Sequence, residues 1–541
     1  MPRSTFQITK RIERSCRIES NLKDGCQNLV GQESSNRKEQ FKVSNRPRVR
    51  APQWPACLFL ALFLVAGGNL WAVDGAVSKR PNVLFIAVDD LRDWVGYLGR
   101  NSQTKTPNID KLAAKGVYFT RAYCAAPVCN PSRAALMSGL RPFATGVYEN
   151  RNDWRTVVPE NLTLPTTFRK AGYYVCGSGK IYHEAYKRRS EWDDYLENDG
   201  KDPEPHGDTG VGGIKFAPLD CRDEDLREWK IVQYGIEQLQ KAHDKPMFLA
   251  VGLHKPHLPW NVPRKYYDLH PLKDIELPPH LDSDLDDLPP AGVKMARRSG
   301  DHANILESGR WKAAVQGYLA AISYCDAMVG RLLAAFEEST YRDNTIICLW
   351  SDHGWSLGEK EHWRKFALWE EPTRSPFIWV VPGLTKSNQA CDRTVDYMSI
   401  YPTLCDLCGI EVPGHVQGRS IHSLLANPKS PWDQPAMTTY LYMNHTIRAE
   451  GWRYIRYHDG GEELYDERGD PNEWRNLANK PEFATKKAEL AKWLPKVNHA
   501  DIGGNRNQGA EEGLPKVQGG SSTENQSGDR GSSKSKKENR N

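Results

Sequence analysis

Three short runs of apolar residues recur along the chain, and each ends in a cluster of polar residues. The runs cover residues 82–88, 247–251 and 345–350. A continuous apolar run of this length is typical of a strand that is buried on both faces of a mostly parallel sheet. Residues 226–242 and 312–338 precede the second and third runs and have helical patterns. Strands that alternate with helices predict an α/β fold, with a large, mostly parallel sheet sandwiched by helices.

The pattern changes at about residue 438. From there on, short aromatic and basic runs such as 453–457 predict a small antiparallel sheet. Residues 192–213 are rich in Asp, Gly and Pro and predict a long surface loop. After about residue 501 the chain holds too few apolar residues to bury a core, so we expect a disordered tail.

The charge of the chain is concentrated near its beginning. The 541 residues carry a formal net charge of +5, but residues 1–50 alone hold 12 Lys and Arg against 5 Asp and Glu. The rest of the chain is therefore slightly acidic, which gives no reason to expect a nucleic-acid partner. A chain of this length can bury a large core and form two domains.

The basic beginning leads into an apolar run at residues 56–68, which is short for a membrane span. A basic approach to a short apolar run is typical of a secretory signal peptide, with cleavage after Ala72 or, alternatively, near Ala76. A single N-terminal anchor is the competing interpretation. We expect export to a periplasmic, secreted or lysosomal-type compartment, with no stable membrane span in the mature protein.

The cysteines are compatible with an oxidising compartment. Without the three cysteines of the leader and Cys129, which is discussed below, eight of the 12 remain. An even number permits disulfides but fixes no pairing. Cys405 and Cys408 lie in an apolar helical stretch without a second ligand pair nearby, so we interpret them as structural thiols.

Acidic residues follow two of the predicted strands. Asp89 and Asp90 end the first apolar run, and Asp352 and His353 end the third. Ligands in open α/β sheets bind beyond the carboxyl ends of the strands, so we expect these side chains to meet there. One Asp pair alone is usually a solvated turn. Carboxylate oxygens from two strands suit a hard cation such as Ca²⁺, whereas the imidazole would also suit zinc.

A cysteine begins a predicted helix at residues 129–133, which read Cys-Asn-Pro-Ser-Arg. Pro131 is suited to a first helical turn, and the free N–H groups of a helix start favour bound anions. Arg133 adds a cation that can donate two hydrogen bonds to an oxyanion. The stretch therefore indicates a site for an anionic ester, although a buried cysteine in a helix cap is the alternative.

Further cations stand near strand ends. Lys180 and His183 follow a strand-like segment, His254 begins a His-Lys-Pro-His motif after the second apolar run, and Lys365 lies 13 residues after Asp352. Singly, such lysines are usually surface residues, and a lone histidine usually has a structural role. Taken together as a joint pattern, however, Cys129, Arg133, Lys180, His183, His254 and Lys365 are candidate catalytic residues.

These motifs resemble those of a known enzyme family. Cys-x-Pro-Ser-Arg is the signature of type I sulfatases, and Leu136–Pro142 looks like a drifted form of the family's continuation, with departures at Met137, Ser138 and Leu140. Gly-Lys-x-x-His, His-Lys-Pro-His and Ser-Asp-His-Gly-Trp-x-Leu-Gly-Glu followed by a lysine resemble the iduronate-2-sulfatase-like branch. The resemblance covers roughly residues 81–477.

The resemblance implies an alkaline-phosphatase-like (sulfatase) fold and a sulfuric ester hydrolase. It implies that Cys129 is oxidised to formylglycine by a formylglycine-generating enzyme or an anaerobic maturase. It also implies that one Ca²⁺ is held by Asp89, Asp90, Cys129 as formylglycine, Asp352 and His353. We accordingly expect a leader with signal peptide at 1–76, a catalytic domain at 79–432, a C-terminal subdomain at 433–500 and a tail at 501–541.

The substrate implied by the resemblance is a sulfated carbohydrate, with the 2-O-sulfate of iduronate in a glycosaminoglycan-like chain as the first expectation. The hypothesis is that a hydroxyl of hydrated formylglycine attacks sulfur, with Asp352 as general base and Lys180 holding the sulfate. Arg133 would hold the diol and the charges on the metal side. His254 or Lys365 would protonate the leaving oxygen, and His183 would accept the proton when sulfate is expelled.

Three alternatives remain. The first is a sulfatase of another sulfated polysaccharide, and the second is a phosphonate or phosphate monoester hydrolase of the same fold. The third is an inactive binding protein, which would require that a ligand residue be missing, and none is missing from the sequence.

Overall fold

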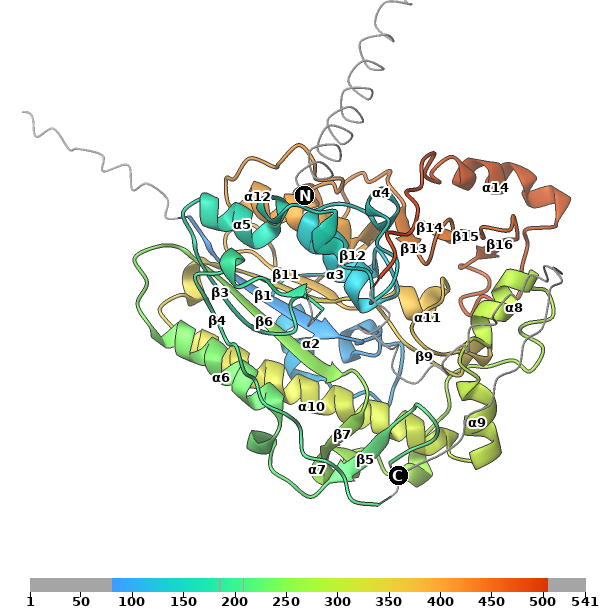
Figure 1. Ribbon diagram of the computed structural model, residues 1–541, viewed down its shortest axis with the longest axis horizontal. Helices are drawn as coiled ribbons and strands as arrows, with labels where there is room; N and C mark the ends of the chain where they lie inside the picture. Colours follow the sequence, from blue (N-terminus) through green and yellow to red (C-terminus); the bar gives the residue numbers. More distant parts are fainter. Residues whose placement is uncertain (1–79, 184–185, 208, 505–541) are drawn as a thin grey trace, which may run out of the picture.

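The computed structural model describes residues 80–183, 186–207 and 209–504 (Figure 1). The predicted leader and signal peptide, and the predicted tail beyond residue 504, lie outside the described residues. The domain boundaries at 79–432 and 433–500 stay predictions.

The core is an eight-stranded sheet with the order β12-β2-β11-β8-β1-β6-β3-β4. The strands are β1 (Asn82–Asp89), β2 (Val117–Tyr123), β3 (Tyr174–Gly179), β4 (Asp194–Tyr195), β6 (Met247–Pro256), β8 (Thr345–Ser351), β11 (Phe377–Val380) and β12 (Gln389–Asp396). β1 pairs in parallel with β6 on one side and β8 on the other, so the three predicted apolar strands are central neighbours. β11 is antiparallel to β8 and β2, and the other pairings are parallel. The predicted α/β fold with a mostly parallel sheet is confirmed.

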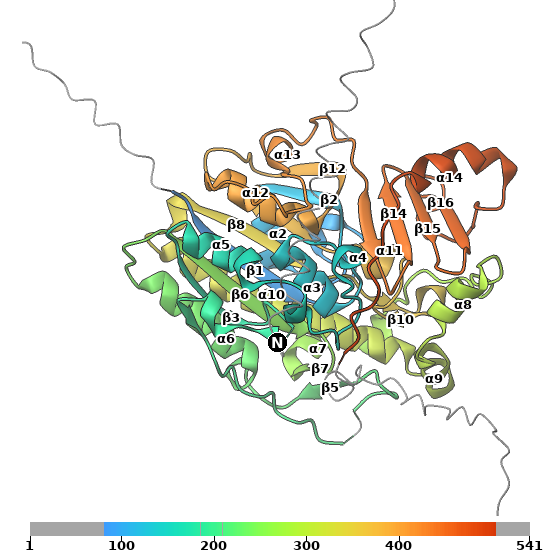
Figure 2. The ribbon, with the colours of Figure 1, turned by 45° about the horizontal axis from the view of Figure 1, so that its top comes forward.

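Helices cover both faces of this sheet (Figures 1 and 2). α6 (Arg227–Gln240) and α10 (Trp311–Glu338) pack on one face, and α3 (Cys129–Ser138), α5 (Leu164–Lys170) and α12 (Ile400–Leu407) pack on the other. Successive side chains of a strand point to opposite faces. Accordingly, Leu84 and Ile86 of β1 belong to the apolar cluster with α10, whereas Phe85 belongs to the cluster with α5. Both clusters are buried, which explains the continuous apolar runs.

α10 is long and apolar enough to cross a membrane by length and composition alone. However, 67% of its most apolar window is buried inside the protein, where it packs against α6, β6 and β7 (Trp260–Pro263). A core helix of a large soluble domain passes the same test, so α10 carries no argument for a membrane span.

The remaining elements surround these layers. The helices are α2 (Pro107–Ala113), α4 (Pro142–Thr145), α7 (Arg264–Asp268), α8 (Pro290–Ala296), α9 (Asp301–Ser308), α11 (Glu370–Thr373) and α13 (His422–Ala426). The strands are β5 (Phe216–Leu219), which pairs with β7, and β9 (Ser356–Leu357), which forms a hairpin with β10 (Trp363–Arg364). Among the described residues of 192–213, which leave out residue 208, the regular pairing is the short β4 and an isolated bridge, in line with the predicted loop.

A second, smaller sheet forms the C-terminal part (Figure 2). β13 (Ala436–Thr439), β14 (His445–Ala449), β15 (Trp452–Arg456) and β16 (Glu462–Asp466) pair in antiparallel order, and α14 (Ala484–Ala491) contacts β14 and β15. This confirms the predicted antiparallel sheet. Buried Arg453 of β15 forms ion pairs with Glu370 and Glu473, which joins the small sheet to residues that follow the β9–β10 hairpin.

The cysteines of the described residues are free thiols. Cys405 lies in α12 and Cys408 follows it, and both are buried. Burial raises the pKa of the Cys405 thiol to about 12 and that of Cys408 to about 11. Such thiols are unreactive at neutral pH, which agrees with a structural role.

Candidate active site

The polar residues that follow the central strands meet at one edge of the sheet. Asp89 is the last residue of β1, Asp352 directly follows β8, Lys180 directly follows β3, and His257 directly follows β6. Cys129 is the first residue of α3 and lies beside them. The site therefore forms where parallel strands end and a helix begins, as expected for a ligand site in a parallel sheet.

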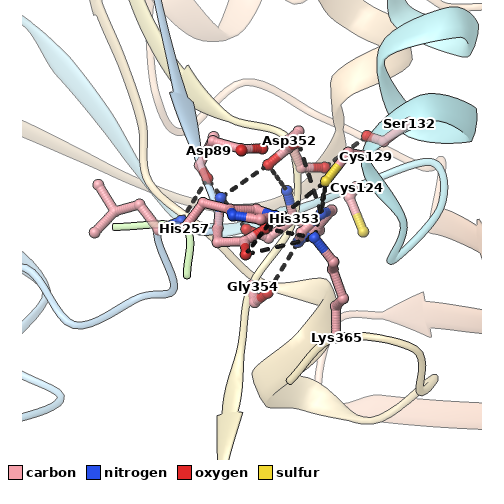
Figure 3. Close-up of polar contacts among 12 residues, drawn as sticks. Asp89, Cys124, Cys129, Ser132, His257, Asp352, His353, Gly354 and Lys365 are labelled. Atoms are coloured by element: carbon pink, nitrogen blue, oxygen red, sulfur yellow. Dashed lines mark hydrogen bonds and ion pairs between the residues drawn. The ribbon is translucent and has the colours of Figure 1, made fainter. Parts of the chain in front are cut away.

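Five side chains at this end of the sheet form a compact buried cluster, and Asp89, Cys129, Asp352 and His353 of this cluster are labelled in Figure 3. One ligand atom from each of Asp89, Asp90, Cys129, Asp352 and His353 lies within 4.8 Å of every other. His353 Nε2 is 3.4 Å from Cys129 Sγ and 3.4 Å from Asp90 Oδ1. The structure thus brings together all five residues that were expected to bind the metal.

The backbone turns sharply to place both carboxylates of the Asp pair in this cluster. Asp90 has a φ of 61°, a left-handed conformation that is uncommon for a residue other than glycine. The turn is held in place because Tyr318 donates a hydrogen bond of 2.7 Å to the Asp90 carbonyl. Asp352 Oδ1 accepts hydrogen bonds of 3.1 Å from the N–H groups of Asp90 and His353. A strained residue held by several bonds is typical of functional sites.

Arg133 connects two of the carboxylates. Its side chain is fully buried, its Nε lies 2.8 Å from Asp352 Oδ2, and its Nη2 lies 3.1 Å from Asp89 Oδ1. Nη1 donates to the carbonyls of Lys180 and Ile181. Because Arg133 is one helical turn from Cys129, α3 fixes the cysteine and the arginine against the same acidic cluster.

Two buried lysines also pair with carboxylates of this cluster. Lys180 Nζ lies 2.5 Å from Asp89 Oδ2. Lys365 Nζ lies 3.0 Å from Asp90 Oδ1 and 2.9 Å from Cys129 Sγ. Lys365 directly follows the β9–β10 hairpin, and its carbonyl is 2.5 Å from the Nε2 atom of buried His362. Both lysines predicted from the sequence therefore lie in the site.

The cluster still favours additional positive charge. Burial, together with the nearby carboxylates of Asp89 and Asp352, raises the pKa of Asp90 to about 8, although Lys365 opposes the shift. Burial also opposes ionisation of Asp89, but Lys180, His257 and Arg133 outweigh it and hold its pKa well below the usual range. Burial lowers the pKa of His353 to about 4, so its imidazole is neutral and can act as a ligand.

These properties fit a hard divalent cation. The donor set is dominated by carboxylate oxygens, which Ca²⁺ prefers, and a cation would keep Asp90 ionised at neutral pH. Asp89, Asp90, Asp352 and His353 would hold the ion together with residue 129. A second acidic group, Glu370, Glu467 and Glu473, is close enough to satisfy the same distance criterion. There, Arg448 and Arg453 already supply the positive charge, which explains the group as a structural ion network.

Comparison with known proteins agrees with this geometry. A family model described as "Sulfatase" matches residues 81–410. The chain belongs to the sulfatase family. A second model, "N-sulphoglucosamine sulphohydrolase, C-terminal", matches residues 358–500 of this sulfatase.

Relatives of this sulfatase support the assignment. A "Sulfatase" from Formosa agariphila is 39% identical over 448 residues, covering 77% of this chain and 87% of that protein. Human "Iduronate 2-sulfatase" is 31% identical, covering 68% of this chain and 76% of that protein. A solved structure described as a "2-O GAG sulfatase" superposes with a TM-score of 0.62 at 24% identity, covering 76% of this chain and 91% of that one. The chain is thus a sulfuric ester hydrolase with the alkaline-phosphatase-like fold.

The histidines of this sulfatase that were predicted to take part in catalysis differ in their distance from the acidic cluster. His183 Nδ1 is buried and has no hydrogen-bond partner among the described residues. Burial and the charge of Lys180 lower the pKa of His183 to about 3. His254 Nε2 lies 3.2 Å from Asp199 Oδ2, and the two residues line a cavity of about 320 Å³. In contrast, His257 Nε2 lies 3.8 Å from Asp90 Oδ2, so the second histidine of the motif faces the acidic cluster.

Residues that were not predicted also support the site. His257 could have been found, because it belongs to the same His-Lys-Pro-His motif as His254. Ser132, in the signature motif, donates a hydrogen bond of 2.6 Å to the Asp352 carbonyl and fixes α3 to the end of β8. Tyr318 in α10 supports the Asp90 turn, but no motif in the sequence marks it.

Proposed function

We propose that this sulfatase removes the 2-O-sulfate from a uronate such as iduronate in a glycosaminoglycan-like chain. The observation that carries the proposal is the position of Cys129 at the start of α3, between Lys365 and His353 in a buried acidic cluster. The similarity of the chain to iduronate 2-sulfatase supports a sulfated uronate as the substrate. The Gly-Lys-x-x-His and His-Lys-Pro-His motifs support the same substrate.

The proposed activity needs a bound Ca²⁺ ion and a modified residue 129. Ca²⁺ would be held by Asp89, Asp90, Asp352 and His353, and it would neutralise charge on the sulfate oxygens and polarise the nucleophile. Cys129 would be converted to formylglycine, whose hydrate supplies a hydroxyl nucleophile in place of the thiol. Burial raises the pKa of the Cys129 thiol well above its ordinary value, so the unmodified residue would be a poor nucleophile.

The timing of the modification follows from burial. Cys129 is 1% exposed in the folded protein. A formylglycine-generating enzyme or anaerobic maturase would therefore act before or during folding. We also propose export of the protein, since its predicted leader has the pattern of a signal peptide.

The chain's own residues would lower the barrier by electrostatic preorganisation. A sulfate monoester resists attack because its oxygens repel an incoming nucleophile, and fixed cations reduce this repulsion. Lys180 forms an ion pair with Asp89, and Lys365 forms one with Asp90. Both lysines would bind the sulfate oxygens. Arg133 would keep the carboxylates of Asp89 and Asp352 in place.

Proton transfer can be assigned to specific atoms. Asp352 would accept the proton of the nucleophile, since its carboxylate and residue 129 belong to the cluster whose ligand atoms lie within 4.8 Å of one another. The ammonium of Lys365, which lies 2.9 Å from Cys129 Sγ, would donate a proton to the leaving alcohol oxygen. His183 would accept a proton during sulfate release through Nδ1, which has no hydrogen-bond partner among the described residues.

The test is release of inorganic sulfate from a disaccharide that carries a terminal 2-O-sulfo-iduronate. The enzyme would be loaded with calcium, and the aldehyde at residue 129 would be confirmed by mass spectrometry. Cys129→Ala is the matched control and should release no sulfate. Release from other sulfated sugars alone would overturn the 2-O-uronate proposal, and hydrolysis of a phosphonate monoester alone would favour the phosphonate-hydrolase alternative.

A pair of variants tests which histidine participates. His257→Gln should lower kcat because His257 faces Asp90, whereas His254→Gln should mainly change KM because His254 lines the neighbouring cavity. A loss of kcat in His254→Gln alone would restore the role first predicted for His254.

A further inference from the structure

A second cavity lies beside the hairpin that precedes the catalytic lysine. Its volume is about 660 Å³, and it is lined by residues of the segment 280–306, by Trp311 at the start of α10, and by Gly358 and Glu361 of the β9–β10 hairpin. A volume of this size can hold a sugar ring. None of the steps proposed above uses this cavity.

The wall of this cavity is apolar and partly open to solvent. Leu281 is 40% exposed and Leu306 is 53% exposed, which is high for large apolar side chains. The indole of Trp311, which also lines the cavity, is flanked by the rings of His280 and His302, with ring centroids 4.9 Å and 5.1 Å away. An apolar and aromatic wall next to a few polar groups is typical of a ligand pocket.

The polar groups of the cavity are nearly balanced in charge. Arg297 Nε and Glu361 Oε2 are 2.8 Å apart at its rim, and Asp282 is exposed. His302 Nδ1 accepts a hydrogen bond of 3.2 Å from Trp363 Nε1, so the proton of the neutral ring lies on Nε2. The lining thus offers donors and acceptors for hydroxyl groups. It contrasts with the active site, where buried Lys180 and Lys365 suit an anion.

The cavity is built onto the same hairpin that positions Lys365. Trp311 Nε1 donates a hydrogen bond of 2.7 Å to the Leu357 carbonyl. A Cβ at Gly358 would lie 2.2 Å from the Trp311 ring, so only glycine allows the hairpin to pack this closely. Buried Arg364 pairs with Asp301, whose neighbours Gly300 and His302 line the cavity. A ligand here would therefore contact the framework of the active site.

We propose that this cavity binds an unsulfated pyranose of the substrate polysaccharide, away from the sulfate that is removed. The C–H face of the ring would pack on Leu281, Leu306 and the part of Trp311 that lines the cavity. Its hydroxyls would hydrogen bond with Asp282, Arg297, Glu361 and His302. This inference rests on the proposed function, because it assumes that the sulfated uronate is part of a longer carbohydrate chain.

A chain-length series tests the proposal on the full, calcium-loaded enzyme. Di-, tetra-, hexa- and octasaccharides with the same terminal 2-O-sulfo-iduronate would be compared by KM and kcat. The wild-type enzyme should show a lower KM beyond a threshold length. Leu306→Asp should raise the KM of the long substrates about fivefold or more, which corresponds to part of a buried leucine contact. It should leave the disaccharide unaffected.

Leu272→Asp is the matched control, since Leu272 is 48% exposed and does not line this cavity. It should not alter KM at any length. Equal KM and kcat for all lengths, or equal effects of the two variants, would overturn the proposal of a sugar-binding cavity. Turnover of the disaccharide in the same experiment would still uphold the proposed function.

If the enzyme turns over none of these substrates, a binding measurement separates the proposed sugar-binding cavity from the proposed activity. Calorimetric titration would use an unsulfated hexasaccharide of alternating glucuronate and N-acetylglucosamine. Binding by the wild type and Leu272→Asp that is weakened in Leu306→Asp would support the sugar site even if the substrate proposal failed. Absent or unchanged binding in this experiment would overturn it.

Discussion

The ion network around Arg453 makes a quantitative prediction about the joint between the two sheets. Arg453 is fully buried and forms ion pairs with Glu370 and Glu473, and its Nη1 donates to the Leu368 carbonyl at 3.0 Å. Arg453→Met keeps much of the side-chain volume but removes the charge. Removing one partner of a buried ion pair costs about 3–5 kcal/mol, because a carboxylate is left without compensation.

This cost should be visible as a change in melting temperature. An unfolding entropy of about 2.1 cal/mol/K per residue over roughly 420 residues gives about 0.9 kcal/mol per degree. Arg453→Met should therefore lower the Tm by about 3–6 °C in scanning calorimetry. Arg456→Met is the control, because Arg456 lies on the same strand and pairs with Glu462 but is 42% exposed. It should cost about 0–1 kcal/mol. Similar shifts for both variants would refute the reasoning.

Three further predictions concern residue 129, the cation and pH. Cys129→Ser should accumulate protein bearing one covalent sulfo group, detected by mass spectrometry, and should lose turnover; sustained turnover would exclude formylglycine. A chelator should abolish activity and lower the Tm, since a bound ligand at a hundredfold excess over Kd stabilises by about 3 kcal/mol, and added Ca²⁺ should restore both. Burial lowers the pKa of His445 to about 4, below its unfolded value of about 6.5, so its contribution to stability is lost as pH falls from 6.5 to 4. His445→Gln should flatten the dependence of Tm on pH in that range, and an unchanged slope would contradict this.

Much of the fold and of the metal site could be predicted because the signals are local. β1, β6 and β8 are buried on both faces, so their apolar runs are continuous and easy to find. Asp89 and Asp352 directly end or follow such runs, and neighbouring parallel strands must bring them together. α3 begins at Cys129, as the helix-start pattern with Pro131 predicts.

The two histidines of the His-Lys-Pro-His motif show where local signals are insufficient. Val88 pairs with Leu253, but Asp89 pairs with Pro256, so β6 has two extra residues at this point. This irregularity places His254 toward Asp199 and brings His257 near Asp90. A bulge depends on how two distant strands pair, and the sequence of either strand alone does not reveal it. The antiparallel direction of β11 depends on tertiary pairing in the same way.

The contacts on either side of Lys365 along the chain limit how the protein can be divided. Lys365 lies between Lys360, which binds Asp284 and the Glu473 carbonyl, and Glu370, which pairs with Arg453. A fragment that stopped at residue 432 would retain every predicted catalytic and metal-binding side chain, but it would bury Glu370 without Arg448 and Arg453. The small sheet is therefore a structural part of the catalytic centre, and recombination between relatives should preserve activity only when both sheets are inherited together.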